Sequence, residues 1–534
     1  MSRAVNASEL RVACNRLGSP RARRALVFAA ALALLGAPGG CGERSAPAPA
    51  RPARIIVFSM DTVRADHVTG WGDAQTTPRI AEIAAEGTRF ARFYGASTFT
   101  IPSHMSIFTG LDPAEHGVFL WDTRLSPDVP TMAELLRGAG YATRAFHEGG
   151  FIAGRFGFDR GFERYEEFPR IAVVREALPQ VLDWMRAQQG PYFLFLHSYA
   201  AHSPYGGYGR YVREHPERGL PRNDEIQKLR ERYSADYVRA GGAVPPSVRT
   251  RCSLLNQFAE WREQALPCGS LYLPRSFPHS AFFDLDRRQL LRSYDARIAL
   301  VDRAIGEIRD LLEERGEWED TLLVVTSDHG EAFFEHAGLS QHGYVPYDSV
   351  LHVPLVVSYP RALRDGGRRV VEERAWHLDL LPTVLGFAGV PAPSGLRGVD
   401  LGPAMRGDAA LPPDRALFPW VRKLVLGEAP VPPRRVALDG PLKWIEGHPH
   451  FGEPGPMLFD LAGDPGEQRN LCAGGRGADC ERLRAAALAW ERSLAPRRPV
   501  HQTTGQPMGE AEAPPSVEVS PEEEEKLRGL GYVE

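Results

Sequence analysis

Short apolar runs that end in polar residues are the feature that most constrains the fold of this 534-residue chain. Three examples are RIIVFSMDT at 54–62, YFLFLH at 192–197 and TLLVVTSDHGE at 321–331. Such runs are typical of strands that are buried on both faces of a parallel sheet. Because segments with helical periodicity lie between them, we predict an α/β fold with a large, mostly parallel mixed sheet sandwiched by helices.

The pattern changes along the chain and so predicts a domain organisation. Residues 54–395 carry the alternating strands and helices, interrupted at about 205–288 by a polar insertion without clear alternation. Residues 396–495 read as a smaller C-terminal subdomain that contains β-strands, and 496–534 as an acidic tail. Long insertions of this kind are often functional, so we expect 205–288 to shape access to a site.

The first 41 residues read as an export signal. Arginines at 21–24 precede an apolar run at 25–36 that is too short to span a bilayer, which favours a signal peptide. The Gly40–Cys41 junction resembles a bacterial lipoprotein cleavage site and predicts a lipid anchor on Cys41, in the periplasm or cell envelope. The alternative is plain secretion with an incidental cysteine. Residues 42–53 form a Pro/Ala-rich linker.

Four further cysteines fall into two close pairs, Cys252 with Cys268 and Cys472 with Cys480. Pairing by proximity would close two short loops in an oxidising compartment, although four unlinked thiols remain the alternative. The formal net charge is -4, so no overall basic field favours a nucleic-acid partner.

Polar residues at the ends of the apolar runs predict one shared site. Asp61, His197 and Asp328 each come at the end of such a run. In parallel sheets, ligands bind beyond the carboxyl ends of the strands, so these residues should meet there. A carboxylate followed by an imidazole, as in Asp328-His329, suits a divalent metal, and Asp61 adds a third compatible ligand. The competing interpretation is a turn in which the aspartate caps the next helix.

The stretch STFTIPSHMSIFTG at 97–110 raises a second candidate. Pro102 suits the first turn of a helix, which places Thr100 at or before the N-cap. A helix start favours an anionic phosphate or sulfate, and a metal can activate a hydroxyl there to attack an ester. The alternative is that the Thr100 hydroxyl only caps the helix.

Histidines are frequent around these segments. His104 follows Thr100 closely, His202 lies in LHSYAAHSPYGG, and His336 and His342 lie in FFEHAGLSQHGY. A site for a tetrahedral anion needs donors for its oxygens and a proton for the leaving group, and His202 and His342 are the candidates. A loop histidine can also simply pack or meet solvent.

Ten segments, taken in order, resemble sulfatase-like enzymes of the alkaline phosphatase superfamily, from about Arg54 to about Leu471. They are SMDTVRADH, TTPRIAEIAAEGTRF, TIPSHMSIFTG, EHGV, HSPY, YDARIALVDRAIG, VVTSDHGE, HGYVPYDSVLHVPLVV, DLLPTVL and MLFDLAGDPGEQRNL. The resemblance implies a catalytic α/β domain with a smaller C-terminal sheet domain. It implies that Thr100 is the nucleophile, that His202 contacts substrate or leaving group, and that His342 lies near a substrate-facing position. It assigns a metal to Asp61, Asp328, His329 and Thr100.

The chain departs from the family pattern at four positions. Classical sulfatases begin the nucleophile motif with a Cys or Ser that is oxidised to formylglycine, which Thr100 cannot form. His104 stands where the motif has Arg, and Thr62 where a second Asp is common. His329 replaces an Asn that is frequent in calcium sulfatases. Because imidazole suits borderline metals, Mn or Zn is favoured over Ca.

These observations predict an exported, metal-dependent hydrolase or transferase that cleaves phosphate, phosphonate or sulfate esters through a Thr nucleophile. The substrate would be a small-molecule, glycan or lipid ester. Two alternatives stay open: a sulfatase that works without formylglycine, and a catalytically degenerate member that binds glycans.

Overall fold

The computed structural model describes the chain from residue 51 to 508 with internal gaps. The described ranges are 51–119, 122–169, 172–203, 281–333, 335–336, 340–364, 367–413, 415–421, 433–447, 453, 455–502 and 504–508. The predicted export signal, most of the linker, the Cys252–Cys268 pair, most of the insertion and the acidic tail beyond 508 lie outside them. None of the helices in the described ranges has the length and apolar character needed to cross a membrane.

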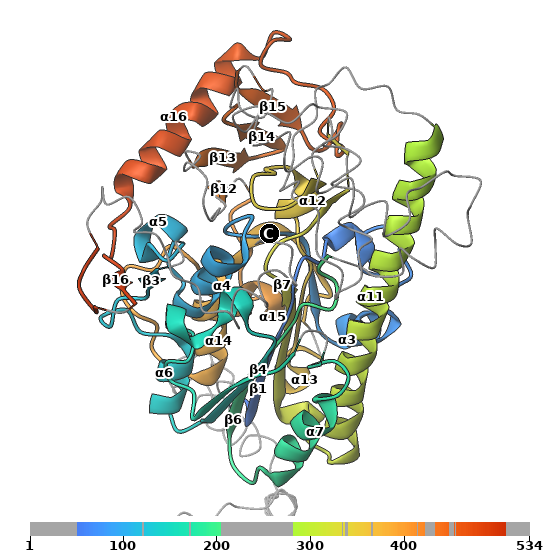
Figure 1. Cartoon of the computed structure of the whole chain (residues 1–534), viewed down its shortest axis with the longest axis vertical. Helices are drawn as coiled ribbons and strands as arrows, with labels where there is room; N and C mark the ends of the chain where they lie inside the picture. Colours follow the sequence, from blue (N-terminus) through green and yellow to red (C-terminus); the bar gives the residue numbers. More distant parts are fainter. Residues whose placement is uncertain are drawn as a thin grey trace, which may run out of the picture. The chain divides into compact units, whose positions relative to one another are not determined.

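An eight-stranded mixed sheet forms the centre of the fold (Figure 1). Its spatial order is β11 (Val370–Trp376), β2 (Thr88–Tyr94), β10 (Leu355–Ser358), β7 (Thr321–Ser327), β1 (Arg54–Met60), β6 (Tyr192–Ser198), β4 (Ala142–His147) and β5 (Arg164–Glu167). Only β10 among these strands runs antiparallel to its neighbours. The central strands are buried on both faces, as the apolar runs predicted. The predicted large, mostly parallel mixed sheet is therefore confirmed.

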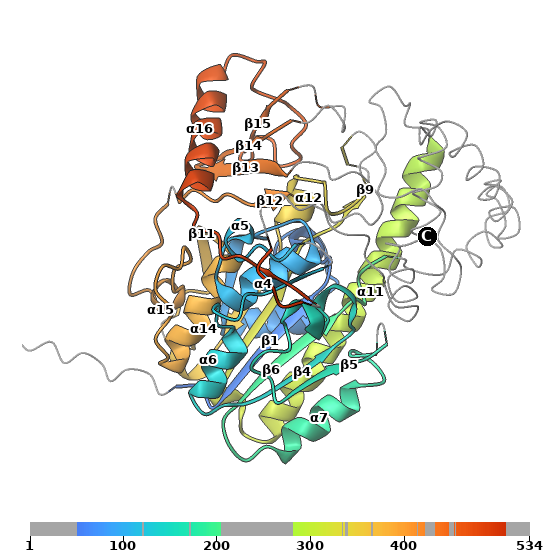
Figure 2. The same cartoon turned by 60° about the vertical axis from the view of Figure 1, so that its left-hand side comes forward.

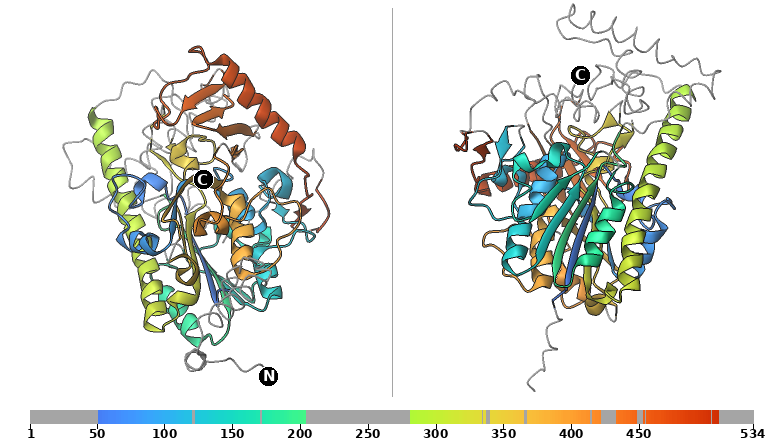
Figure 3. Two further views of the ribbon diagram at one scale, coloured as in Figure 1. Left: turned by 180° about the vertical axis from the view of Figure 1, so that it is seen from behind. Right: turned by 60° about the horizontal axis from the view of Figure 1, so that its bottom comes forward.

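Two hydrophobic cores cover the two faces of this sheet. Along β1, Ile55 and Val57 belong to one core, and Ile56 and Phe58 to the other. The first core packs α4 (Thr100–Thr109), α6 (Met132–Gly138), α14 (Leu380–Ala388) and α15 (Gly402–Arg406). The second packs α3 (Pro78–Glu86), α7 (Leu178–Ala187) and α11 (Ala281–Glu314). Figures 2 and 3 show the two groups of helices on opposite sides of the strands.

A separate antiparallel sheet lies toward the C-terminus. Its order is β12 (Trp420–Val421), β13 (Arg434–Asp439), β14 (Leu442–Ile445) and β15 (Met457–Asp460). One face packs against α16 (Gly477–Ser493). The other packs on the part of the chain that contains the eight-stranded sheet, called the main unit below, and its contacts include α12 (Asp348–Leu351). The predicted β-containing C-terminal subdomain is present, and Cys472 forms the predicted disulfide with Cys480 of α16.

Short elements complete the described chain. They are α5 (Pro113–His116), α13 (Pro360–Leu363), the two-stranded ribbon of β3 (Thr123–Arg124) with β16 (Val500–His501), and the ribbon of β8 (Ala332–Phe333) with β9 (Ser340–Gln341). The β3–β16 ribbon joins residues that are far apart in the sequence, so the segment after α16 returns to the main unit.

Candidate active site

The residues predicted at the strand ends do meet in the structure. Asp61 follows β1, and Asp328 and His329 follow β7, which is the parallel neighbour of β1 with Met60 opposite Ser327. All three side chains are fully buried, and their ligand atoms lie within 4.8 Å of one another. Two carboxylates and one imidazole form a donor set that suits a divalent cation.

Thr100 is the first residue of α4 and reaches into this group. The N-cap residue is Phe99, which makes no side-chain capping bond. The Thr100 hydroxyl lies 3.2 Å from His329 Nε2 and 3.5 Å from Asp61 Oδ2. The hydroxyl therefore faces the cluster of Asp61, Asp328 and His329, and the helix-capping alternative does not describe its contacts. We call Asp61, Thr100, Asp328 and His329 the strand-end site.

Thr62 shapes the turn that carries Asp61. Its φ is 60°, a left-handed conformation that is unusual for a β-branched residue and that indicates an imposed local geometry. The backbone N–H of Thr62 donates to Asp328 Oδ1 at 3.2 Å, and its hydroxyl donates to the Asp61 carbonyl at 2.7 Å. The Tyr294 hydroxyl donates to the Thr62 carbonyl at 2.6 Å. Thr62 thus orients Asp328 through its backbone.

His104 lies behind the first turn of α4. Its Nδ1 is 3.0 Å from the Thr100 carbonyl oxygen, so we assign the ring hydrogen to Nδ1, and the Ser59 hydroxyl then donates to Nε2 at 2.8 Å. Burial lowers the pKa of His104 more than the nearby Asp328 raises it, which favours a neutral ring at pH 7. His104 therefore holds the Thr100 backbone and, unlike the arginine of the family motif, supplies no fixed positive charge.

His197 faces Asp61 from the neighbouring strand. It is the sixth residue of β6, so it lies within the strand and not beyond it, and its Nε2 is 3.3 Å from Asp61 Oδ2. Burial, and then the neighbouring histidines, lower its pKa well below the ordinary value, so this imidazole is neutral as well.

A buried atom of Asp328 supports the fit of a cation. Oδ2 of Asp328 accepts no hydrogen bond from any described residue, and it lies 3.3 Å from His329 Nε2 and 3.5 Å from His104 Nδ1. Burial raises the pKa of Asp328, but His329 and the backbone N–H groups of Thr62 and His329 outweigh it and lower the pKa below its ordinary value, so the carboxylate stays charged. A buried charged oxygen without a hydrogen-bond donor is costly unless a cation meets it.

The structure brings the two predicted acid candidates together beside the strand-end site. The His342 ring centre lies 4.3 Å from that of His329 and 5.2 Å from that of His202. The His342 Nδ1 lies 3.2 Å from Oε1 of Glu331, a fully buried carboxylate that the sequence analysis missed. Its position three residues after Asp328, in SDHGE, was the available signal. His336 lies elsewhere, with its ring stacked on Tyr347 at 3.5 Å.

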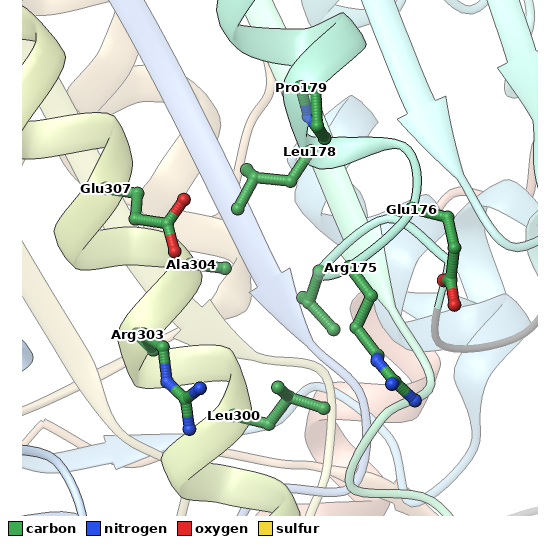
Figure 4. Close-up of a pocket in the computed structure, with 9 residues that line it drawn as sticks. Arg175, Glu176, Leu178, Pro179, Leu300, Arg303, Ala304 and Glu307 are labelled. Carbon is green, nitrogen blue, oxygen red and sulfur yellow. The ribbon is translucent and has the colours of Figure 1, made fainter.

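An open cavity of about 400 Å³ lies between α11 and the segment that leads into α7 (Figure 4). None of the predicted site residues lines it. Its charged lining is of mixed sign, with Arg175, Glu176, Arg303 and Glu307. The cavity is therefore separate from the strand-end site.

Comparison with known proteins gives a consistent result. The family model described as Sulfatase matches residues 53–390. An N-acetylglucosamine-6-O-sulfatase of Bacteroides thetaiotaomicron is 25% identical over 428 residues, which cover 68% of this chain and 72% of that protein.

Two solved structures have the same fold. One is a complex with the substrate D-glucosamine-2-N,6-O-disulfate, with a TM-score of 0.62 and 21% identity, covering 83% of this chain and 98% of the other. The second is the phosphonate monoester hydrolase of Agrobacterium radiobacter, with a TM-score of 0.60 and 20% identity, covering 83% and 95%. The predicted alkaline phosphatase-like architecture is thereby confirmed.

Proposed function

Because this chain belongs to the sulfatase family of ester hydrolases, we propose that it is an exported, metal-dependent hydrolase that cleaves sulfate or phosphonate esters with Thr100 as its nucleophile. The observation that carries the proposal is the Thr100 hydroxyl, at the start of α4, facing both Asp61 and His329. A hydroxyl that merely stabilised a helix would not face a buried group of metal-ligand side chains.

The strand-end site fits a divalent cation, which Asp61, Asp328, His329 and Thr100 would hold. When bound, such a cation lowers the pKa of a coordinated hydroxyl and offsets negative charge on the ester oxygens. The imidazole in the donor set favours Mn or Zn. The start of α4 adds backbone N–H groups that favour an anion beside Thr100.

The reaction would proceed in two displacements. In the first, Thr100 Oγ bonds to the sulfur or phosphorus atom, its hydroxyl proton passes to Asp61, and the bond to the alcohol oxygen breaks. The departing oxygen takes a proton from His202 or His342. In the second, water attacks the threonyl ester and gives its proton to the same histidine. Sulfate or phosphonate leaves, and the Thr100 oxygen regains its proton from Asp61.

Glu331 supports His342 in this scheme, and the Ser203 carbonyl supports His202. A carboxylate on Nδ1 fixes the tautomer and orientation of an imidazole, as the aspartate of a catalytic triad does. Because Nδ1 of His342 is hydrogen-bonded to Glu331 at 3.2 Å, Nε2 is the ring nitrogen that would transfer the proton. His202 Nδ1 donates to the Ser203 carbonyl at 2.5 Å, which again leaves Nε2 as the transferring atom.

The names of two similar proteins support a proposal for the class of substrate. One is an N-acetylglucosamine-6-O-sulfatase and the other a phosphonate monoester hydrolase, so we propose a glycan sulfate or a phosphonate monoester. Specificity would come from the insertion at 205–288 and from loops of the subdomain at 396–495. Cys41 would carry the lipid anchor that keeps the enzyme at the cell envelope.

Matched esters of one alcohol test the reaction. Purified protein, reconstituted with Mn or Zn, is assayed on an aryl sulfate, an aryl phosphonate and an aryl phosphate, and on glucosamine 6-sulfate. We expect turnover of at least one ester, and intact-mass measurement after an acid quench should find a sulfate or phosphonate adduct on the peptide with Thr100. Absence of turnover on all four esters, with metal bound, would refute the hydrolase proposal and favour a glycan-binding member.

A further inference from the structure

Two buried ion pairs of the C-terminal subdomain lie against the segment that follows His342. Arg434, the first residue of β13, pairs with Glu453, and Lys443 of β14 pairs with Glu467 at 2.8 Å. All four side chains are at most 4% exposed. We call them the C-terminal ion pairs.

The alternation of β13 explains why Arg434 points toward the main unit. Val436 and Leu438, which share its face, pack in the core between the sheet and the main unit. Arg435 and Ala437 face the other way, toward α16, and Arg435 pairs with Glu491 of that helix at 2.8 Å. Adjacent arginines on one strand thus have opposite environments.

Arg434 fixes the backbone just after His342. Its Nη1 donates to the Tyr344 carbonyl at 3.1 Å, its Nε donates to the Glu446 carbonyl at 3.0 Å, and its Nη2 pairs with Glu453. The other carboxylate oxygen of Glu453 accepts a hydrogen bond from the Tyr347 hydroxyl at 3.2 Å. Arg434 and Glu453 therefore hold the segment at Tyr344 and at Tyr347.

The same segment is attached at both of its ends. The N–H of Gly343 donates to the Thr98 carbonyl at 2.8 Å, and the Thr98 hydroxyl donates back to the Gly343 carbonyl, two residues before Thr100. At the far end, Asp348 accepts from Lys443 at 2.6 Å, and its N–H donates to Glu467 at 2.6 Å.

We propose that Arg434 is a positioning residue for His342: it holds the Tyr344 carbonyl so that the His342 ring stays between His329 and His202. The inference rests on the proposed function, in which His342 faces the reacting ester. It gives the C-terminal sheet a role in the reaction although none of the strand-end residues comes from it. Misplacing a reacting group by about 1 Å can cost roughly a hundredfold in rate.

The test uses the full chain with Arg434→Met, Arg434→Lys and Arg435→Met as the matched control. Hydrogen exchange of the peptide that spans 342–348, followed by mass spectrometry, reports on the segment without any need for turnover. We expect Arg434→Met to accelerate exchange of the Gly343 and Tyr344 amides about tenfold or more, because the carbonyl that Arg434 holds becomes free to move. Arg435→Met should leave exchange within twofold.

Arg434→Lys separates positioning from folding. Lysine keeps a charge for Glu453 but lacks the planar fork that reaches three acceptors, so it should keep the melting temperature closer to wild type while exchange stays fast. If hydrogen exchange of the 342–348 peptide is unchanged in both Arg434 variants, the proposal is wrong. If Arg434→Met does not fold, the exchange of Arg434→Lys alone decides the test.

Steady-state kinetics then test whether Arg434 affects turnover through the position of His342. With bound metal unchanged, Arg434→Met should lower kcat about tenfold or more with little change in KM, and should lower it no further in a His342→Ala background. Fast exchange with normal kcat, or fully additive losses, overturns the positioning role. If the wild-type protein turns over no ester, the proposed function fails, while the exchange measurement still decides whether Arg434 holds the segment.

Discussion

The strand-end site and the C-terminal ion pairs are both buried groups of charged side chains, but their partners differ. At the C-terminal sheet each carboxylate meets an arginine or a lysine: Glu453 meets Arg434, and Glu467 meets Lys443. At the strand-end site, Asp61 and Asp328 face imidazoles, and burial keeps those of His104 and His197 neutral. In the first group each carboxylate has an arginine or a lysine as its partner, whereas the second group contains neither and favours a cation from solution.

This difference separates a structural role from a chemical one. A buried ion pair with full hydrogen bonding repays its desolvation and fixes one arrangement of the chain, as Arg434 does with three acceptors. The carboxylates of Asp61 and Asp328, with His329, form a site that can bind metal, and the Thr100 hydroxyl faces that site. Mutations in the first group should therefore change stability or geometry, and mutations in the second should change metal binding or chemistry.

The largest effect is expected at Thr100. Thr100→Ala removes the attacking oxygen and should lower kcat by at least about 10³-fold, while the melting temperature changes little because the hydroxyl caps no helix end. Thr100→Ser keeps an oxygen and should retain measurable turnover and the covalent adduct. Steady-state assays on the best ester check both variants, with metal content as the control. Near-normal turnover by Thr100→Ala would show that Thr100 is not the nucleophile.

The next largest effect is expected at Asp328. There the sign of the change in melting temperature should depend on whether metal is present. Asp328→Asn removes a metal ligand and should weaken metal binding by more than about a hundredfold, since even loss of an outer-shell partner costs 10- to 100-fold. With metal present the variant should melt below wild type, because it loses the stabilisation that binding supplies. In chelator the order should reverse or vanish, because the variant no longer buries a charge at Oδ2. Calorimetry with and without chelator measures these melting temperatures. If chelator does not change the melting temperature of the wild type, the prediction is wrong.

At Lys443 we expect the opposite result, a loss of stability without any change in metal binding. Lys443→Met leaves Glu467 and Asp348 without their buried cation and should lower the free energy of unfolding by about 3 kcal/mol. Metal content should not change, because Lys443 contacts none of the strand-end residues in the described structure. The matched control is Arg482→Met, which breaks an exposed pair with Asp439 on the same sheet and should cost under about 1 kcal/mol. Urea unfolding measures both variants. If both lose the same free energy of unfolding, the buried pair contributes no more to stability than the exposed one.

The sequence predicted the strand-end site because its residues are ordered by rules that act locally. Apolar runs located β1 and β7, and parallel neighbours must bring Asp61 and Asp328 together. The start of a helix could be read from Pro102, which placed Thr100 near its N-terminus. Local patterns also predicted the Cys472–Cys480 disulfide.

The remaining features depend on contacts that no local pattern encodes. Arg434 meets the Tyr344 carbonyl across 90 positions of sequence, and its orientation follows from the register of β13. The left-handed backbone of Thr62 is imposed by its partners, since a β-branched residue does not favour it. Glu331 could be seen in the sequence, but its role appears only once His342 lies beside it.

The last effect, a dependence of stability on pH, is expected at Asp112, between the end of α4 and α16. This buried carboxylate follows α4 and accepts hydrogen bonds from the Ala114 N–H at 2.9 Å and from the Trp490 indole of α16 at 3.0 Å. Burial raises its pKa to about 7 although both bonds act in the opposite direction. Between the ordinary value of 3.8 and about 7, the folded chain holds a proton that the unfolded chain has lost. The free energy of unfolding should therefore fall as pH rises through this window, by at most about 1.4 kcal/mol per pH unit, and level off above 7.

Asp112→Asn isolates this contribution because the amide stays neutral at every pH and still offers an oxygen to one donor. Unfolding in urea from pH 4.5 to 7.5 should give a shallower slope for the variant than for wild type. Asp183→Asn is the control, because Asp183 forms only an exposed pair with Arg186 among the contacts described. If wild type and Asp112→Asn share one slope, the Asp112 carboxylate is already ionised in the folded chain. The Ala114 N–H, the Trp490 indole and the nearby Arg397 would then outweigh burial, and this junction would hold a buried charged carboxylate, as the strand-end site does at Asp328.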